Sequence, residues 1–408
     1  MSKAFKAKIF NDPVYGFISV HDEIILKIID HPYFQRLRRI KQLGLTHSVY
    51  PGALHTRFHH VLGCTHLMRQ AIQTLRENGA EISDEEALGV ILAILLHDIG
   101  HGPFSHALEH SIVSGMHHEE LSVLYMEALN EEFDGALDIC LAIFKNEYPK
   151  KFLHQLVSSQ LDMDRLDYLK RDSFYTGVSE GVVSNQRIIK MLELKDDSLV
   201  IQQKGIYSIE KFIVARRLMY WQVYLHKTVI SAEFMLVKIL DRANQLAKRG
   251  TELFCSPAFK YFLYQDIDSE SFKTKETLDA FANLDDTDIL GAIKVWQTHE
   301  DKVLSMLASM IVNRNLLKIR LQEEPFTEEE IQKRRDQFAQ ENGISAEDAA
   351  YFVFADFIEN NAYNATSDRI NILYKNGEVK DITEASDNLN IQSLSNPVRK
   401  YFLCAPSF

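Results

Sequence analysis

Histidines gather in one part of the chain in a pattern that favours metal chemistry. Eleven of the 16 histidines fall between residues 47 and 118, a density that core packing alone does not require. Imidazole is the commonest transition-metal ligand in proteins, and it titrates near neutral pH. Histidines mixed with carboxylates therefore predict a metal site with acid–base groups beside it. Metal-assisted hydrolysis is the simplest use of such a site.

The sharpest signal is the segment HDIGHGPFSH, which begins at His97. A nearly continuous apolar run precedes it, so we expect His97 and Asp98 at the interior end of a buried helix, with His101 one turn farther along. A buried carboxylate loses its hydration and needs a compensating partner. A divalent ion bound to Asp98 would supply one.

Three segments together resemble the HD-domain phosphohydrolases: RFHH at 57–60, HDIGH at 97–101 and LDMDRLDY at 161–168. Their order, a histidine, a His-Asp pair and an aspartate, is the signature of that family. The resemblance implies a helical-bundle core and a metal bound with open positions for water and a phosphate oxygen. Mn, Fe, Ni, Zn or Mg would suit such ligands. By the resemblance, the ligands would be His60, His97, Asp98 and Asp164.

The resemblance runs from residue 8 to about residue 227 and points to one subgroup of that family. The chain looks like the deoxynucleoside triphosphate (dNTP) triphosphohydrolases, which include the animal enzyme with SAM and HD domains and its bacterial relatives. These enzymes cut dNTPs to deoxynucleosides and inorganic triphosphate. The implied catalytic residues beside the phosphates are Arg57, His101, His106 and His118, with His101 and His118 the best acid–base candidates.

The resemblance also implies how the rest of the substrate is held. Gln42 and Leu43 would face the sugar, where a close apolar side chain would reject a 2′-hydroxyl. The remaining pocket residues would be Arg165, Tyr168, Asp172, Arg216 and Tyr224. Three positions depart from the animal pattern: Arg165 replaces a lysine, Glu109 an aspartate and Tyr220 a histidine. The last change removes a titratable donor near the sugar and phosphates.

A second nucleotide site follows from the same resemblance. In activated relatives a guanine nucleotide lies between subunits, at positions that match Lys8, Ile9, Asn11, Asp30, Gln35, Arg38 and Phe58. His226 and Lys227 match positions that contact a neighbouring allosteric triphosphate. We therefore expect GTP or a dNTP to act as an activator and to promote a homo-oligomer, a dimer or a tetramer.

Sequence patterns predict a mostly α fold with β structure near both ends. A hairpin is expected at 6–20, where Asn11, Asp12 and Pro13 separate two β-prone runs. Gly44 should cap the helix that starts at Pro32. Helices are expected at 24–29, 32–43, 57–78, 84–96, 119–131, 152–169, 209–246 and 327–343. Strands are expected at 316–322, 350–358, 369–383 and 399–406, the third folding back at an Asn-Gly turn.

These elements suggest three parts: an HD phosphohydrolase core with the hairpin at 1–250, a helical extension at 251–315 and a small α+β domain at 316–408. The 408 residues carry a net charge of −12, from 45 basic and 57 acidic side chains. Such a surface disfavours nonspecific binding to nucleic acid or an anionic membrane, so phosphates need a local basic pocket.

Compartment and membrane signals are equally plain. The four cysteines lie far apart and predict neither a disulfide framework nor a thiolate zinc site. The first residues lack the layout of a signal peptide, and no apolar run is long enough to span a bilayer. We therefore expect a cytoplasmic protein with no membrane partner.

Two other functions fit the same residues. One is a different HD phosphohydrolase, a 5′-nucleotidase, a phosphodiesterase or a nuclease, because the metal centre specifies phosphate-ester cleavage but not the leaving group. The other is a nucleotide sensor that assembles on ligand binding without turnover. The products formed from a dNTP would separate all three functions.

Overall fold

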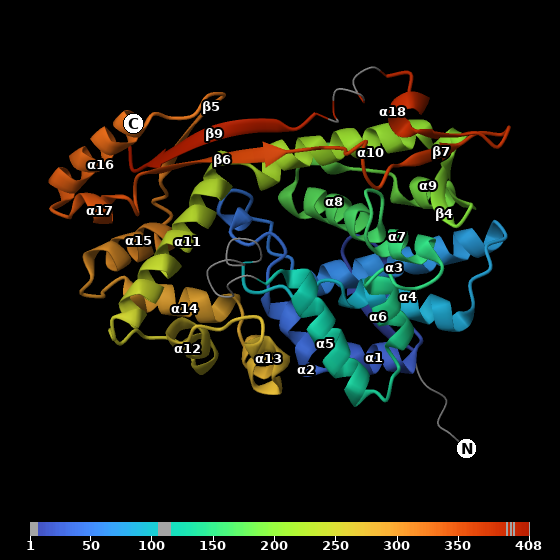
Figure 1. The fold of residues 1–408 in the computed structure, drawn as a ribbon, viewed down its shortest axis with the longest axis horizontal. Helices are drawn as coiled ribbons and strands as arrows, with labels where there is room; N and C mark the ends of the chain where they lie inside the picture. The colour runs from blue at the N-terminus through green and yellow to red at the C-terminus, as the bar shows by residue number, and fades with distance from the viewer. Residues whose placement is uncertain (1–6, 105–115, 389–390, 392–393, 395, 408) are drawn as a thin grey trace.

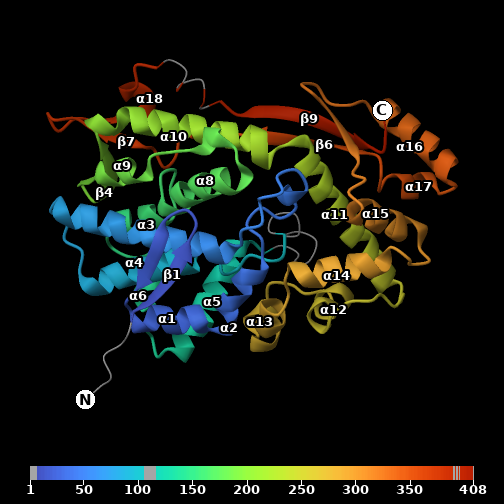
Figure 2. The same ribbon diagram turned by 180° about the vertical axis from the view of Figure 1, so that it is seen from behind.

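The fold is mostly α and carries small β-sheets near both ends of the chain (Figure 1). This computed structural model describes residues 7–104, 116–388, 391, 394 and 396–407. At the N-terminus, β1 (Lys8–Asp12) and β2 (Gly16–Val20) form the expected antiparallel hairpin. Seen from behind, it lies beside the long central helix α3 (Arg57–Glu77) (Figure 2), which β2 contacts.

Three helices form the centre of the molecule and position the site. Helix α3 packs against α4 (Asp84–Leu96) and α8 (Met163–Thr176). Gly63 allows the close approach of α8, because a Cβ atom there would collide with the Asp167 carboxylate. A capping box begins α4: Glu86 N donates to Ser83 Oγ at 3.1 Å, and Ser83 N donates to Glu86 Oε2 at 2.8 Å.

Other helices surround this centre. Before α3 lie α1 (Glu23–Asp30), α2 (Pro32–Gln35), and the 3₁₀ turns η1 (Arg36–Arg39) and η2 (Thr46–Ser48). Between α4 and α8 lie α5 (His118–Glu132), α6 (Asp138–Phe144) and α7 (Lys151–Val157). After α8 come η4 (Ser179–Gly181), α9 (Asn185–Lys190), η5 (Gln203–Gly205), α10 (Ile206–Met219) and α11 (Lys227–Lys248).

The C-terminal 150 or so residues mix short helices with strands. The helices are α12 (Pro257–Tyr264), η7 (Ser271–Lys273), α13 (Lys275–Ala282), α14 (Asp286–Trp296), α15 (Lys302–Val312), α16 (Glu328–Asn342), α17 (Ala346–Ala349) and α18 (Ile382–Ala385). One antiparallel sheet has the order β5 (Lys318–Gln322), β9 (Val398–Ala405), β6 (Phe354–Asn360). The expected strands and the helix between them are confirmed.

A second sheet joins distant parts of the chain. It has the order β3 (Leu192–Lys195), β4 (Ser198–Gln202), β7 (Asn371–Leu373), β8 (Val379–Asp381), with β4 parallel to β7. The sequence interpretation did not include β3 and β4. The division into three parts stays a prediction, although this sheet already ties residues of the third part to the first.

Three predicted helices end or break early. The prediction of a helix from Pro32 is wrong beyond Arg39, where helical structure ends, and Gly44 does not cap it. Arg57 N donates to Ile40 O at 3.0 Å, and Lys41 forms a β-bridge with Thr56. These contacts fit the extended backbone of Ile40, at which the helical path ends.

The second break divides the predicted 152–169 helix into α7 and α8. The Asp162 carboxylate accepts from Ser159 N at 2.9 Å and from Arg165 N at 2.7 Å, so it ends one segment and caps the next. The third break divides 209–246 at a π-helical turn, η6 (Tyr220–Tyr224), where Leu225 N donates to Tyr220 O at 2.7 Å. His226 then caps α11 through Thr228 N at 3.2 Å.

Apolar burial unites most of the chain in one large core, to which all three central helices contribute. All four cysteines are unpaired. Among the described residues, no helix has both the length and the apolar character that a membrane span requires.

Candidate functional site

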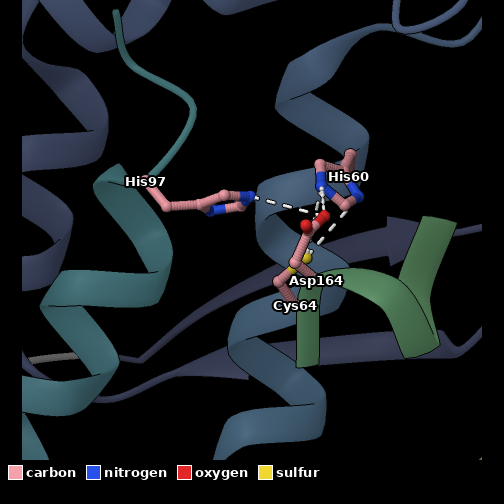
Figure 3. Close-up of side chains that lie close together, drawn as sticks. All are labelled: His60, Cys64, His97 and Asp164. Carbon is pink, nitrogen blue, oxygen red and sulfur yellow. Dashed lines mark hydrogen bonds and ion pairs between the residues drawn. The ribbon is translucent and has the colours of Figure 1, made fainter. Parts of the chain in front are cut away.

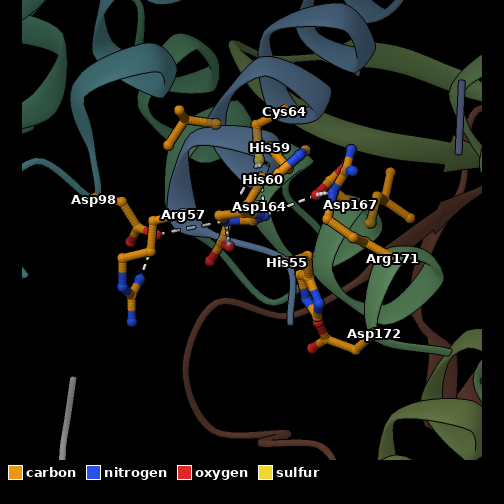
Figure 4. A network of polar contacts seen from close by, with 12 residues as sticks. His55, Arg57, His59, His60, Cys64, Asp98, Asp164, Asp167, Arg171 and Asp172 are labelled. Atoms are coloured by element: carbon orange, nitrogen blue, oxygen red, sulfur yellow. Dashed lines mark hydrogen bonds and ion pairs between the residues drawn. The ribbon is translucent and has the colours of Figure 1, made fainter. Parts of the chain in front are cut away.

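Side chains from the three central helices converge at one point. Figure 3 shows His60, His97 and Asp164 there, with Cys64 beside them, and Asp98 is labelled in Figure 4. His60 comes from α3, His97 directly follows α4, and Asp164 lies in the first turn of α8. Asp164 Oδ1 is 3.0 Å from His60 Nε2 and 3.6 Å from His97 Nε2. Asp98 Oδ1 is 3.5 Å from His97 Nε2, and Asp98 Oδ2 is 3.8 Å from His60 Nε2. The structure thus brings the four predicted ligand residues together; their binding of a metal stays a prediction.

The two imidazoles are oriented for metal binding. His60 Nδ1 lies 2.7 Å from the Asp167 carboxylate, and His97 Nδ1 lies 2.6 Å from the carbonyl oxygen of Ile94. Both partners are acceptors, so each Nδ1 carries the proton and each Nε2 presents its lone pair to the cluster. His97 Nε2 is buried and has no hydrogen-bond partner. An orphaned lone pair beside two carboxylates fits a divalent cation.

A fifth group also approaches the cluster. Cys64 Sγ lies 3.6 Å from His60 Nε2, and ligand atoms of Cys64, His60, His97 and Asp164 all lie within 4.8 Å of one another. Burial raises the pKa of the Cys64 thiol, which favours the protonated form. Asp98 has the opposite character, because its carboxylate stays ionised.

Opposite charges balance one another within the cluster. Burial raises the pKa of Asp98, but the charges of Arg57, His97 and His101 outweigh it and hold that pKa well below its usual range. Burial also raises the pKa of Asp164, but its contacts with the His60 and His97 imidazoles outweigh burial and hold that pKa well below its usual range. Burial lowers the pKa of His97, yet Asp98 brings it above the ordinary value. These carboxylates are therefore anions in a dry environment, as cation ligands should be.

The predicted acid–base residues stand next to this cluster. His101 Nε2 lies 3.2 Å from Asp98 Oδ1, and the His101 ring stacks on His118 with centroids 3.9 Å apart. Arg57 forms an ion pair with Asp98. His106 lies outside the described residues, as does Glu109.

A cavity of about 560 Å³ opens beside the cluster. Every predicted substrate residue lines it: Gln42, Leu43, Arg165, Tyr168, Asp172, Arg216 and Tyr224. The cavity also reaches Arg57, His97, Asp98, His101, His118 and Asp164. One enclosed space thus joins the metal-type cluster to cationic, aromatic and apolar side chains, which is the composition that a nucleotide requires.

A network of buried polar side chains contacts the metal-type cluster (Figure 4). Arg171 is completely buried and binds the Asp167 carboxylate at 2.8 and 3.0 Å and Asp12 of the hairpin at 2.7 Å. Asp172 accepts from Tyr224 Oη at 2.8 Å and lies 2.7 Å from His55 Nε2. The hairpin, α3 and α8 are therefore joined through buried charge.

Several site residues were missed from the sequence. Asp167 follows Asp164 by three positions, a helical spacing that could have identified the partner of His60. Glu119 adjoins His118 and lines the cavity, as do Phe104, His154 and Glu233. Glu233 lies on α11 without a hydrogen bond or ion pair to the described residues, and burial raises its pKa to about 7. No local pattern marks it.

The predicted activator residues form a separate surface group. Lys8 Nζ lies 3.0 Å from Asp30 Oδ1, with both side chains well exposed. Arg38 donates to Gln35 Oε1 at 2.9 Å and lies 3.5 Å from the centre of the Phe58 ring. Ile9 and Asn11 are exposed on β1, and His226 and Lys227 begin α11. The structure brings together Lys8, Asp30, Gln35, Arg38 and Phe58. A nucleotide bound there stays a prediction.

Comparison with protein families identifies the central part of the chain. Residues 57–172 match the HD domain, and residues 183–253 match an HD associated region. The first range contains all four residues of the cluster. The second contains the π-helical turn and all of α11.

Similar proteins cover the whole length. A phosphohydrolase from Bacteroides thetaiotaomicron, known from a crystal structure, is 55% identical in sequence and superposes with a TM-score of 0.95. The match covers 98% of this chain and 100% of that chain. The uncharacterized protein YwfO of Bacillus subtilis is 34% identical over 94% of this chain and 89% of its own length. The deoxynucleoside triphosphate triphosphohydrolase SAMHD1 homolog of Dictyostelium discoideum is 34% identical over 60% of this chain and 51% of that protein.

Proposed function

Because the chain belongs to the HD-domain phosphohydrolase family, we propose that it hydrolyses dNTPs to deoxynucleosides and inorganic triphosphate with the help of a divalent metal ion. The observation that carries the proposal is the single cavity that holds both a metal-type cluster and three arginines, Arg57, Arg165 and Arg216. A monophosphate ester would need fewer cations than this wall offers.

We assign the metal ligands to His60, His97, Asp98 and Asp164. Asp98 is preferred to Cys64 because it is ionised, whereas the buried thiol holds its proton. A divalent ion at this position supplies Lewis acidity, which acidifies water and offsets negative charge on a phosphate oxygen. Its identity is open among Mn, Fe, Ni, Zn and Mg.

The protein's own side chains would bind and orient the substrate. Guanidinium groups are planar donors that hold phosphate oxygens in a fixed geometry, and the Nε atoms of Arg165 and Arg216 are buried without partners. Tyr168, Tyr224 and Asp172 would flank the nucleoside. Such preorganised donors stabilise charge that develops at the α-phosphorus.

His101 and His118 are the proposed proton carriers. Their stacked rings lie on the cavity wall beside Asp98, so either imidazole could protonate the leaving 5′-oxygen. Burial and the nearby Arg57 charge hold the pKa of His101 well below its usual range. We assign His106 to the same group from the family resemblance.

Activation by GTP or a dNTP, with assembly of a dimer or tetramer, belongs to this proposal. Lys8, Asp30, Gln35, Arg38 and Phe58 would hold the guanine nucleotide, with Ile9 and Asn11 beside them and His226 and Lys227 near a second nucleotide. We also propose a cytoplasmic location, in keeping with the unpaired cysteines.

Product analysis tests the proposal directly. Purified protein is incubated with Mn²⁺ and each dNTP, with and without GTP or dGTP, and the products are separated by anion exchange; EDTA serves as the control. Deoxynucleoside plus triphosphate in equal amounts is expected. Phosphate or a nucleoside monophosphate would indicate another HD phosphohydrolase instead. Tight binding with assembly but no product would indicate the sensor.

A further inference from the structure

One buried carboxylate outside the central helices bridges two segments of the cavity wall. Asp286 is the first residue of α14 and is 2% exposed. Its Oδ2 atom accepts from Lys41 N at 3.0 Å, and its Oδ1 atom accepts from Phe104 N at 3.0 Å. Lys41 Nζ lies 3.5 Å from the same carboxylate. Asp286 therefore ties the segment after η1 to the segment after the HDIGH motif.

Both bridged segments line the cavity. Gln42, Leu43 and Gly44 follow Lys41 directly, and all three belong to the wall, as does Phe104. The segments touch: a Cβ atom on Gly44 would lie 3.6 Å from the carbonyl oxygen of Phe104. Phe104 has φ of +54°, a left-handed conformation that a bulky residue adopts only when its surroundings enforce it. The hydrogen bond to Asp286 is one such constraint.

This wall differs chemically from the arginine side of the cavity. Leu43 and Phe104 are apolar, and Gln42 beside them has its Oε1 atom buried without a partner. None of these three side chains carries a positive charge for a phosphate. Gln42 Oε1 offers an acceptor to a hydroxyl group and the other two side chains offer apolar contact, so these residues suit a sugar. A second hydroxyl against Leu43 or Phe104 would lose its hydrogen bonds to water.

We propose that Asp286 is a positioning residue that fixes this wall and thereby sets the preference for deoxyribonucleotides over ribonucleotides. The proposal rests on the proposed function. Asp286 acts through Lys41 and Phe104 and is not itself among the cavity-lining residues. Without the carboxylate, the two segments lose their shared acceptor, and the wall is free to move away from the sugar.

Asp286→Asn tests the proposal, with Asp285→Asn as the matched control. The amide keeps the size of the side chain but has one acceptor atom, so it cannot serve both N–H groups. Asp285 forms an ion pair with Arg39 and caps α14 through Thr287 N at 2.8 Å, and these contacts involve neither wall segment. The measured quantity is kcat/KM for dATP divided by kcat/KM for ATP.

In Asp286→Asn we expect this ratio to fall by roughly tenfold, mainly through KM, with metal content unchanged. The control should keep the ratio within about twofold. A merely structural role would lower both rates together and leave the ratio intact. An unchanged ratio in Asp286→Asn would therefore overturn the proposal.

A second variant and a binding measurement keep the test decisive if Asp286→Asn does not fold. Phe104→Leu keeps the backbone donor and shortens only the ring, and it should lower the same ratio. Binding of α,β-imido analogues of dATP and ATP gives the preference without turnover. Wild-type protein that binds neither analogue contradicts the proposed function, and this inference with it. Wild-type discrimination that both variants retain contradicts the inference alone.

Discussion

The two sides of the cavity are prepared for a ligand in opposite ways. On the side of α3, α4 and α8, each carboxylate of the cluster faces an imidazole or guanidinium group within hydrogen-bond or ion-pair distance. On the other side, polar atoms of Gln42 and Arg216 are buried without partners, and Glu233 has none among the described residues.

The difference shows how the work of the site is divided. The paired side is held rigidly before anything binds, so its geometry depends on the fold and on the resident ion. The unpaired side keeps its hydrogen-bonding capacity for the substrate, at some cost in stability while the cavity is empty. Substitutions on the first side should abolish chemistry. Those on the second should change selectivity or stability.

The largest effect is expected at the metal cluster. Asp98→Ala or His97→Ala should lose the bound metal and at least about a thousandfold of the turnover, because a ligand and its charge are removed together. Metal content by mass spectrometry and the initial rate check this. Cys64→Ala is the control and should keep both. If Cys64→Ala lost the metal while Asp98→Ala retained it, the assigned ligand set would be wrong.

The next largest effect is expected from the buried residues that contact the metal ligands from outside the cavity. Asp167→Asn should weaken metal affinity by about 10- to 100-fold, since the amide no longer fixes the proton on His60 Nδ1. Competition with a fluorescent chelator measures it. Asp12→Asn removes the other carboxylate on Arg171 but leaves the contact between Asp167 and His60 in place. Equal loss in the two variants would mean that the buried network acts as a whole.

The central cluster could be predicted from sequence because its residues lie in, or directly after, helices whose pattern is local, and because their motifs resemble those of a known family. The HDIGH motif ends a strongly apolar helix, and α3 and α8 show helical spacing of their own. What could not be predicted depends on contacts between distant residues: Lys41 and Phe104 with Asp286, or Ile201 beside Ile372 in the second sheet. The helix breaks at Asp162 and Tyr220 have a different origin, because local cap and π-turn geometry overrides helix propensity there.

A smaller effect is expected away from both sides of the cavity, at the end of α1, where Asp30 pairs with Lys8 of the hairpin. Asp30→Ala should reduce stimulation by GTP or dGTP several-fold while sparing metal content and the unstimulated rate, because it removes the acceptor for guanine's N–H groups. Rates measured across activator concentrations check this. Glu23→Ala breaks an exposed ion pair on the same helix and serves as the control. Equal stimulation of wild type and Asp30→Ala would remove Asp30 from the activator site.

The smallest effect is expected on protein stability, from the Glu233 carboxylate. Burial raises the pKa of Glu233 to about 7, above the value of 4.5 expected in the unfolded chain. Between these values the folded protein binds more protons, so this group lowers stability as the pH rises. Glu233→Gln should therefore stabilise the protein by about 2 kcal/mol at pH 8 and by almost nothing at pH 4.

Thermal unfolding at the two pH values checks this prediction, with a rise of roughly 2–5 °C expected at pH 8 only. Glu329→Gln alters an exposed carboxylate and should shift neither melting temperature. A gain of equal size at both pH values would show that the carboxylate is not the cause.

The π-helical turn at Tyr220–Tyr224 determines how α11 is oriented relative to α10. The chain leaves this turn through Leu225 and His226, and His226 has extended backbone and caps α11, so one residue removed from the turn would shift the start of α11 and turn its face relative to α10. Glu233 would then leave the cavity, and the apolar stripe of α11 would turn away from α15. The spacing between Arg216 and Glu233 is thus a length constraint on the chain, one that substitutions can satisfy but insertions and deletions cannot.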